Sequence, residues 1–264
     1  MLEALQYDFI QNALLAGILI SIAAGIIGSL IIVNRITFLA GGIAHSSYGG
    51  IGIAIYLGIP VLFGATLFSI IIAVIIAALT LNDKKRIDSI IGIMWATGMA
   101  IGIVFVDLTP GYNVDLMSYL FGSIIAVPTS DIWYMFGLDI TIIVLVVYYY
   151  REFLAISHDS EFARLRGINI KFFYTLLLVL AALTVVAAIK VVGLILVIAL
   201  LTIPTYLAEI FSNTLSKMMI LSSMLATFFT ILGLWFSYMY DISSGASIIL
   251  VSVVCLVIVK FIKR

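Results

Sequence analysis

His45 is the ionisable side chain best placed for metal chemistry in this chain, because it falls inside a long apolar stretch. Glycine, alanine and serine surround it in the sequence LAGGIAHSSYGGIG, residues 39–52. Small residues let membrane helices approach closely, and ionisable groups at membrane depth usually face the interior of a helix bundle. Neutral imidazole is also a common ligand of zinc and related metals. We therefore predict that His45 lies in an ion path; the alternative is a packed histidine that donates to a neighbouring carbonyl oxygen.

Two carboxylates, Glu209 and Asp139, are further candidates for contact with a cation. Glu209 follows Pro204, which removes a backbone hydrogen bond and is expected to kink a helix. Asp139 lies eight residues beyond Asp131, a distance of about 12 Å along a helix that rises about 1.5 Å per residue. Each has a structural alternative: Glu209 as an interfacial acid in water, and Asp139 as an acid that faces a neighbouring helix.

The sequence lacks the combinations of side chains that an enzyme active site requires. His158, the other histidine, lies in a charged segment, and neither histidine belongs to an HExxH or paired-aspartate motif. Ser46 and Ser47 lack a base at a suitable spacing. The sequence contains no Walker-type Gly-Lys-Ser/Thr loop. The chain therefore cannot bind nucleotide in the P-loop manner, and an intramembrane enzyme is the least supported interpretation.

The composition indicates which elements must position these side chains. The chain has 264 residues, of which 64% are hydrophobic, with 13 Lys and Arg and 13 Asp and Glu. A soluble protein of this length would carry roughly 66 charged residues at about 25%. The single cysteine, Cys255, excludes a disulfide within the chain, and the zero net charge offers no electrostatic basis for binding nucleic acid. A polytopic membrane protein remains.

The apolar runs are continuous and about 20 residues long, which favours transmembrane helices over alternating barrel strands. We predict an all-α bundle in a single domain, 1–264, with eight to nine spans. The segment 171–209 could be a helix pair or one broken helix around Lys190. Counted as a pair, it gives nine spans, at 12–32, 40–57, 61–81, 89–106, 132–150, 171–189, 191–209, 218–238 and 243–260.

Basic residues favour the cytoplasmic side of a membrane. If Lys84-Lys85-Arg86 is cytoplasmic, nine alternating spans place 12 of the 13 basic residues on that side, and only Lys190 falls outside. This predicts a multi-pass protein of the cell's inner (cytoplasmic) membrane, with its N-terminus outside and its C-terminus in the cytoplasm. The acidic start, Met-Leu-Glu, predicts that no cleavable signal peptide is present.

Two connections are longer than turns. Segment 107–131, on the outer side, includes the semi-apolar run 117–124, which is too short to span and is expected to be interfacial or re-entrant. Segment 151–170, on the cytoplasmic side, has the densest charge. Within it, Asp159–Gly167 has an acidic start, a basic end and a terminal glycine, which together predict a short helix. Its apolar edge could dock a soluble partner; the alternative is a solvated loop.

Several segments, taken together and in order, resemble the integral membrane permeases of zinc- and manganese-type ABC importers. The resemblance covers nearly the whole chain. It rests on Gly28 with Arg35, the His45 segment ending at Gly49-Gly50, Asp88 with Ile91-Gly92, Asp115-Leu116 with 119–123, Asp159–Gly167, Val192–Val197 leading to Pro204 and Ala208, and Asp241 with Ser244-Gly245-Ala246.

The resemblance implies a permease homodimer that works with two cytoplasmic ATPase subunits and an extracytoplasmic metal-binding protein. The Asp159–Gly167 segment, with Glu161, would be the coupling helix that docks on the ATPase. This chain would hold no cofactor of its own, since ATP binds the partner. Its cargo would be a divalent metal ion, zinc or manganese, imported by alternating access.

Two positions depart from the family pattern. Members carry an aspartate one helical turn before the histidine, where this chain has Gly41, and a basic residue where it has Glu209. We hypothesise that Glu209 or water replaces the missing acid, or that the two copies of His45 in a dimer approach the path together. The missing aspartate leaves open an ABC permease for another cargo such as a metal chelate. A second alternative, of a different class, is a secondary transporter driven by an ion gradient through Asp139, Glu209 and Lys190.

Overall fold

The computed structural model describes residues 6–81, 86–110 and 122–262, and regular secondary structure in these residues is entirely helical. This confirms the predicted all-α membrane bundle. Among the described residues, eight helices are long and apolar enough to cross a membrane. They are α1 (Asp8–Val33), α2 (Phe38–Leu57), α3 (Val61–Thr80), α4 (Ile87–Asp107), α6 (Thr129–Tyr148), α9 (Ile170–Val192), α11 (Leu215–Tyr240) and α12 (Ser244–Ile262).

The predicted segment 171–209 is a helix pair of unequal length. Helix α9 continues past Lys190 to Val192, and the chain then leaves helical geometry at Gly193, whose φ is +82°. Helix α10 (Val197–Phe211) has 15 residues and contains Pro204. A helix of that length rises about 22 Å, less than the roughly 30 Å of hydrocarbon in a bilayer. The ninth predicted span is therefore a short helix preceded by a non-helical turn.

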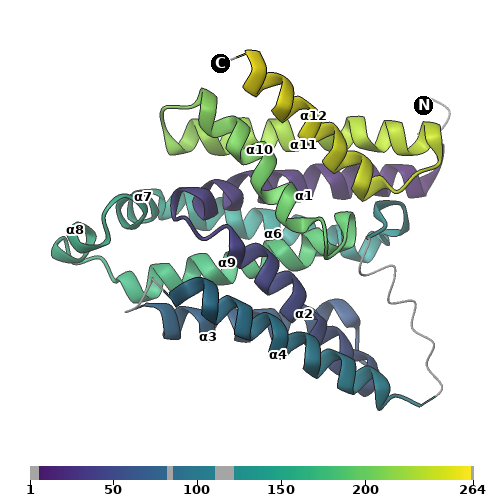
Figure 1. Ribbon diagram of the computed structural model, residues 1–264, viewed down its shortest axis with the longest axis horizontal. Helices are drawn as coiled ribbons and strands as arrows, with labels where there is room; N and C mark the ends of the chain where they lie inside the picture. The colour runs from purple at the N-terminus through teal and green to yellow at the C-terminus, as the bar shows by residue number, and fades with distance from the viewer. Residues whose placement is uncertain (1–5, 82–85, 111–121, 263–264) are drawn as a thin grey trace.

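The helices run between two ends of the bundle (Figure 1). Helix α1 starts at the right-hand end, whereas α12 runs from that end toward the left and finishes at the top of the view, left of centre. The left-hand end holds α7 (Tyr150–His158), α8 (Ser160–Leu165) and the connection from α10 to α11. The right-hand end holds the short 3-10 helix η3 (Ile124–Ala126) and the connection from α9 to α10.

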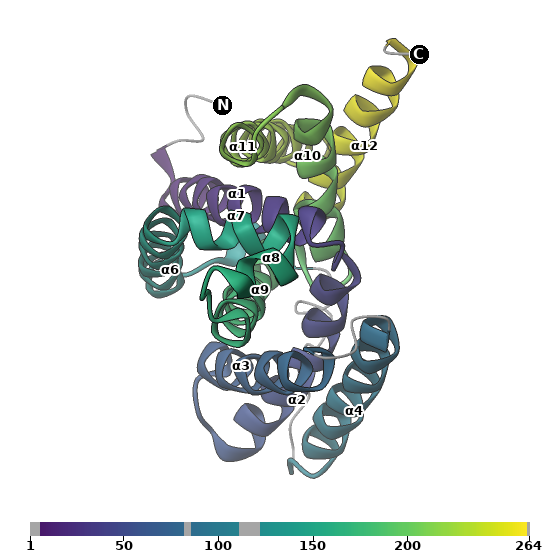
Figure 2. The ribbon, with the colours of Figure 1, turned by 90° about the vertical axis from the view of Figure 1, so that its left-hand side faces the viewer.

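Helix α1 forms the centre of the bundle because small and branched residues around its whole circumference are buried. It packs on α6, α9, α10 and α11 (Figure 2). Its contact with α11 is close at Gly25, where an added Cβ would lie 2.5 Å from the Cα atom of Ser223. Such approaches are typical of membrane helices, whose association depends on backbone proximity and dispersion rather than on the hydrophobic effect.

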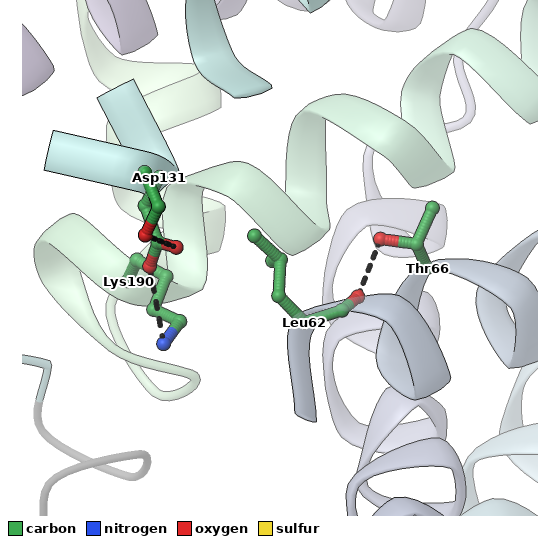
Figure 3. Close-up of polar contacts among 5 residues, drawn as sticks. Leu62, Thr66, Asp131 and Lys190 are labelled. Atoms are coloured by element: carbon green, nitrogen blue, oxygen red, sulfur yellow. Dashed lines mark hydrogen bonds and ion pairs between the residues drawn. The ribbon is translucent and has the colours of Figure 1, made fainter. Parts of the chain in front are cut away.

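The right-hand end is fastened by an ion pair between α6 and α9. The Nζ atom of Lys190 lies 3.3 Å from Oδ2 of Asp131 (Figure 3). The backbone N–H of Ser123 donates to the carbonyl oxygen of Lys190 at 3.4 Å, and the side chain of Ile124 is fully buried. Residues 122–128 of the predicted outer segment thus pack on the bundle, and most of its semi-apolar run falls in 111–121, outside the described residues.

The left-hand end holds the predicted cytoplasmic segment 151–170, which is more helical than we expected. Helix α6 ends at Tyr148, and α7 starts at Tyr150 in a new direction. The predicted loop before Asp159 is therefore helix α7, whose Phe153 and Ile156 are buried. The expected short helix is present as α8. Lys84 and Lys85, two of the basic residues on which the predicted orientation depends, lie outside the described residues.

Candidate metal path and coupling helix

The position of His45 follows from how closely α2 and α4 pack. Gly98 of α4 faces Ser46 of α2 so closely that an added Cβ would lie 2.5 Å from the Cα and carbonyl oxygen of Ser46. One turn further along α4, Gly102 faces Tyr48 in the same way. Gly98 and Gly102 therefore allow the backbones of α2 and α4 to approach each other beside His45. Trp95, one turn before Gly98 on α4, stacks on the imidazole of His45.

The imidazole of His45 stacks on the indole of Trp95. The ring centroids are 3.9 Å apart and the ring planes differ by 8°. The indole is fixed in turn, because its Nε1–H donates to the sulfur of Met99 at 3.2 Å. Nδ1 of His45 is buried and forms no hydrogen bond with any residue in the described part of the chain. The expected alternative, a histidine bonded to a carbonyl oxygen through this nitrogen, is not observed.

Helix α10 fills the space beside Gly41, the position where an acid is expected from the family pattern. A Cβ atom built on Gly41 would contact Cδ1 of Ile198, near the start of α10. The missing carboxylate thus coincides with a site where an apolar side chain from another helix packs against α2. Because the contacting atom is the end of a flexible side chain, a larger residue at Gly41 requires a shift of Ile198 rather than of the backbone.

Glu209 lies near the end of α10 and lines a separate pocket. This pocket has a volume of about 470 Å³ and is lined by residues of α1, the connection between α1 and α2, α10 and α12, among them Arg35, Tyr206 and Glu209. Nζ of Lys260 lies 5.2 Å from the ring centroid of Tyr206. Arg35 thus shares the lining of this pocket with the exposed Glu209, Lys260 lies against Tyr206, and His45 is not among the lining residues.

Asp139 is buried on α6, with 4% of its surface exposed. Its Oδ2 atom has no hydrogen-bond partner among the residues that the structure describes. Helix α6 packs on α1 and α9, on the opposite side of the bundle from α4 and α12 (Figure 2). The structure thus does not bring Asp139 together with His45 or Glu209. Within one copy of the described chain, no cluster of three or more His, Cys, Asp or Glu side chains could hold a metal ion.

Helix α8 is a short helix that is capped at both ends. The Asp159 carboxylate accepts hydrogen bonds from the backbone N–H groups of Glu161 and Phe162, at 2.9 and 3.1 Å. At the other end Gly167 has a φ of +78°, and its N–H donates to the carbonyl oxygen of Arg164 at 3.0 Å. This is the cap chemistry that favours a helix of only six residues.

The outward edge of α8 is apolar. Ala163 is fully buried against the bundle, whereas Phe162 is 49% and Leu165 87% exposed. The guanidinium carbon of Arg166 lies 4.7 Å from the ring centroid of Phe162. Phe162 and Leu165, three residues apart, therefore form one exposed apolar edge of α8 at this end of the bundle.

Sequence reasoning did not identify Trp95 or Tyr206 as parts of these sites. Trp95 lies on a different helix from His45, and the signal that could have pointed to it is its place one turn before the tightly packed Gly98 on α4. Tyr206 contributes to the Glu209 pocket from the preceding turn of α10. That proximity follows from helical spacing, but the pairing with α12 depends on tertiary packing.

Comparison with known proteins agrees with this arrangement. Residues 6–263 match the ABC 3 transport family. The chain is 46% identical over 264 residues, all of this chain and 94% of the relative, to an uncharacterised membrane protein of Synechocystis sp.. It is 35% identical over 250 residues, 95% of this chain and 89% of the relative, to the manganese transport system membrane protein MntC of Listeria monocytogenes.

A solved structure is similar throughout. PsaBC from Streptococcus pneumoniae, in complex with Fab, superposes with a TM-score of 0.87 at 31% sequence identity, and the match covers 97% of this chain and 93% of that chain. The family match spans almost the whole sequence. The helical bundle of this chain is the fold that its apolar runs predicted. The chain therefore belongs to the ABC 3 transport family.

Proposed function

We propose that this chain is the permease subunit of an ATP-driven importer of a divalent metal ion in the cytoplasmic membrane. Manganese is the first cargo to test, because the Listeria relative is named a manganese transport protein; zinc is the second. The family match does not favour an ion-gradient-driven secondary transporter or a chelate permease. The observation that carries the proposal is α8, a capped helix with an exposed apolar edge in a chain that lacks a P-loop.

In this mechanism ATP binds a separate cytoplasmic ATPase, and α8 transmits its closure to the permease. Asp159, Glu161 and Gly167 keep α8 helical, while Phe162 and Leu165 supply the apolar contact. Since α8 connects through α7 and α9 to the body of the bundle, a displacement of α8 moves packed helices rather than a loose loop. An extracytoplasmic metal-binding protein delivers the ion at the opposite end.

A second copy of the chain completes the path. Helices α4 and α12 project on one side of the bundle, and α2 and α10 lie between them (Figure 2). The helix that carries His45 and the pocket that carries Glu209 belong to this side. A twofold partner on the same side would place two imidazoles and two carboxylates along a shared interface. A sparse ligand set suits transport, because the ion must bind weakly enough to leave.

In the membrane, we place α8 in the cytoplasm. The ends of the bundle then assign the start of α1 to the outside and the end of α12 to the cytoplasm. Accessibility of single cysteines introduced into a Cys255→Ser background at Tyr7 and Phe261 tests this orientation. A membrane-impermeant thiol reagent applied to intact cells should label the first and spare the second.

Co-purification tests the proposed partnership. The tagged chain is expressed with the P-loop ATPase encoded nearest to it and purified in a mild detergent. Leu165→Glu should abolish retention of the ATPase, because it places a charge on the apolar edge of α8. The matched control, Asn213→Glu, introduces the same side chain on the exposed connection between α10 and α11, at the same end of the bundle. This variant should retain the ATPase. Equal retention by both variants would contradict the assignment of α8.

A further inference from the structure

A second hollow lies on the side of the bundle away from His45. It is a groove of about 400 Å³ whose floor is Ile22 and Ile26 of α1, whose walls are α6 and α11, and which ends at Tyr150 of α7. We call it the α6–α11 groove. In Figure 2, α6, α1 and α11 lie to the left, and α4 and α12 lie on the other side. The groove therefore belongs neither to the candidate metal path nor to the proposed dimer face.

The lining of the groove is apolar for a structural reason. Ser223 of α11 is one of its few polar residues, and its hydroxyl donates to the carbonyl oxygen of Met219 at 2.9 Å and to that of Ile22 at 3.2 Å. The Ser223 hydroxyl is thus hydrogen-bonded to backbone carbonyl oxygens rather than directed into the groove. The rims are open to the surroundings, since Val147 on α6 is 69% and Met224 on α11 64% exposed. A groove of this kind on a membrane-facing surface excludes water and accepts hydrocarbon.

One end of the groove is closed and flanked by basic residues. The phenol oxygen of Tyr150 accepts a hydrogen bond from the backbone N–H of Ser216 at 3.1 Å, which joins α7 to α11 across the groove. The residues that follow these two are Arg151 and Lys217, both exposed. An apolar channel whose closed end is formed by residues adjacent in sequence to two exposed cations is complementary to an amphiphile that has an acyl chain and an anionic headgroup.

We propose that the α6–α11 groove binds one acyl chain of an anionic phospholipid, whose headgroup contacts Arg151 and Lys217. The closed end places the headgroup at the level of α7, which is the bundle end that we assign to the cytoplasm. Each methylene group buried in the groove favours binding, and the two cations select the headgroup. Bound lipid would fill the space between α6 and α11 and so hold α7, which leads into α8, against α11.

Native mass spectrometry of the full-length chain in a mild detergent tests the proposal. The probes are phosphatidylglycerol and phosphatidylcholine with identical acyl chains. The wild-type chain should retain phosphatidylglycerol about fivefold better, which is the preference expected for about 1 kcal/mol from a basic residue near a headgroup. Lys217→Gln should reduce this preference toward equality, whereas Lys171→Gln, on the same end of the bundle but outside the groove, should not.

The apolar part is tested by filling the groove. Val147→Trp should reduce retention of both lipids about tenfold, whereas Val144→Trp, an exposed position on the same helix that does not line the groove, should leave retention unchanged. Met224→Trp fills the groove from the opposite wall and replaces Val147→Trp if that variant does not fold. Equal retention by the filled and control variants overturns the proposal. If the wild-type chain forms concentration-dependent dimers and Val147→Trp makes them dissociate, the groove binds a second copy of the chain. That result would also overturn the lipid proposal.

Discussion

The imidazole of His45 lies flat against the indole of Trp95, with ring centroids 3.9 Å apart and ring planes 8° apart. This contact joins α2 to α4 at the one histidine that lies within a candidate span. It restricts the orientation of the imidazole, while Nδ1 remains without a hydrogen bond in the described part of the chain. A ring that is held by stacking, rather than by a hydrogen bond to Nδ1, is consistent with the proposed role of that nitrogen in binding an ion.

Replacing Trp95 should weaken transport without preventing assembly. Trp95→Leu removes the stacked surface and frees the imidazole to rotate, so we expect manganese uptake by the assembled transporter to fall about fivefold, the equivalent of about 1 kcal/mol for a lost aromatic pair. Trp95→Phe should retain more of the activity. Trp133→Leu on α6, which is 70% exposed, is the matched control. Uptake that is equal in Trp95→Leu and Trp133→Leu would contradict a positioning role.

The close approach of α2 and α4 makes Gly98 sensitive to a single added methyl group. Gly98→Ala places a Cβ atom 2.5 Å from backbone atoms of Ser46, so the helices must separate. We expect a loss of about 1–3 kcal/mol in the free energy of unfolding, as for other overpacked sites. Gly137→Ala on α6 is the control, because nothing lies within 4 Å of the added methyl group. Thermal unfolding in detergent should lower the midpoint for the first variant alone.

Restoring an acid at position 41 should strengthen capture of the metal. Gly41→Asp adds a carboxylate one helical turn before His45, at the cost of moving the Cδ1 end of Ile198. We expect the half-saturating manganese concentration for uptake to fall about tenfold, which corresponds to about 1.4 kcal/mol. Gly41→Asn has nearly the same shape without the charge and should show no such gain. The same gain in both variants would mean that packing against Ile198, and not the carboxylate, affects uptake.

The ion pair between Asp131 and Lys190 should stabilise the end of the bundle near η3. Both side chains are partly buried, so removal of one charge leaves the other poorly solvated. Lys190→Met and Asp131→Asn should each lower the free energy of unfolding by about 1–3 kcal/mol, and the double variant by less than the sum. A double-mutant cycle on thermal unfolding measures this coupling. Additive losses would show that the two charges act independently.

The sequence predicted the spans well because their signal is local. Continuous apolar runs of about 20 residues identify membrane helices without knowledge of their neighbours, and all eight long apolar helices found in the described residues correspond to predicted spans. The position of α8 also followed from local chemistry, since Asp159 and Gly167 cap it directly.

Features that depend on two distant segments could not be predicted in this way. Only Asp159–Gly167 of the connection was predicted to be helical; the preceding helix α7 is stabilised by burial of Phe153 and Ile156 against the bundle. The stacking of Trp95 on His45 and the α6–α11 groove arise between helices far apart in the sequence. The separation of Glu209 from His45 likewise appears only once α10 is placed.

ATP-dependent uptake of manganese tests the central claim most directly. The chain is reconstituted in lipid vesicles with its ATPase and its metal-binding protein, and uptake of the ion is compared between the wild type and His45→Ala. We predict that the His45→Ala complex assembles, hydrolyses ATP and loses most of its uptake, because the imidazole no longer contacts the ion. Wild-type uptake by an assembled His45→Ala complex would contradict the assignment of His45 to the metal path.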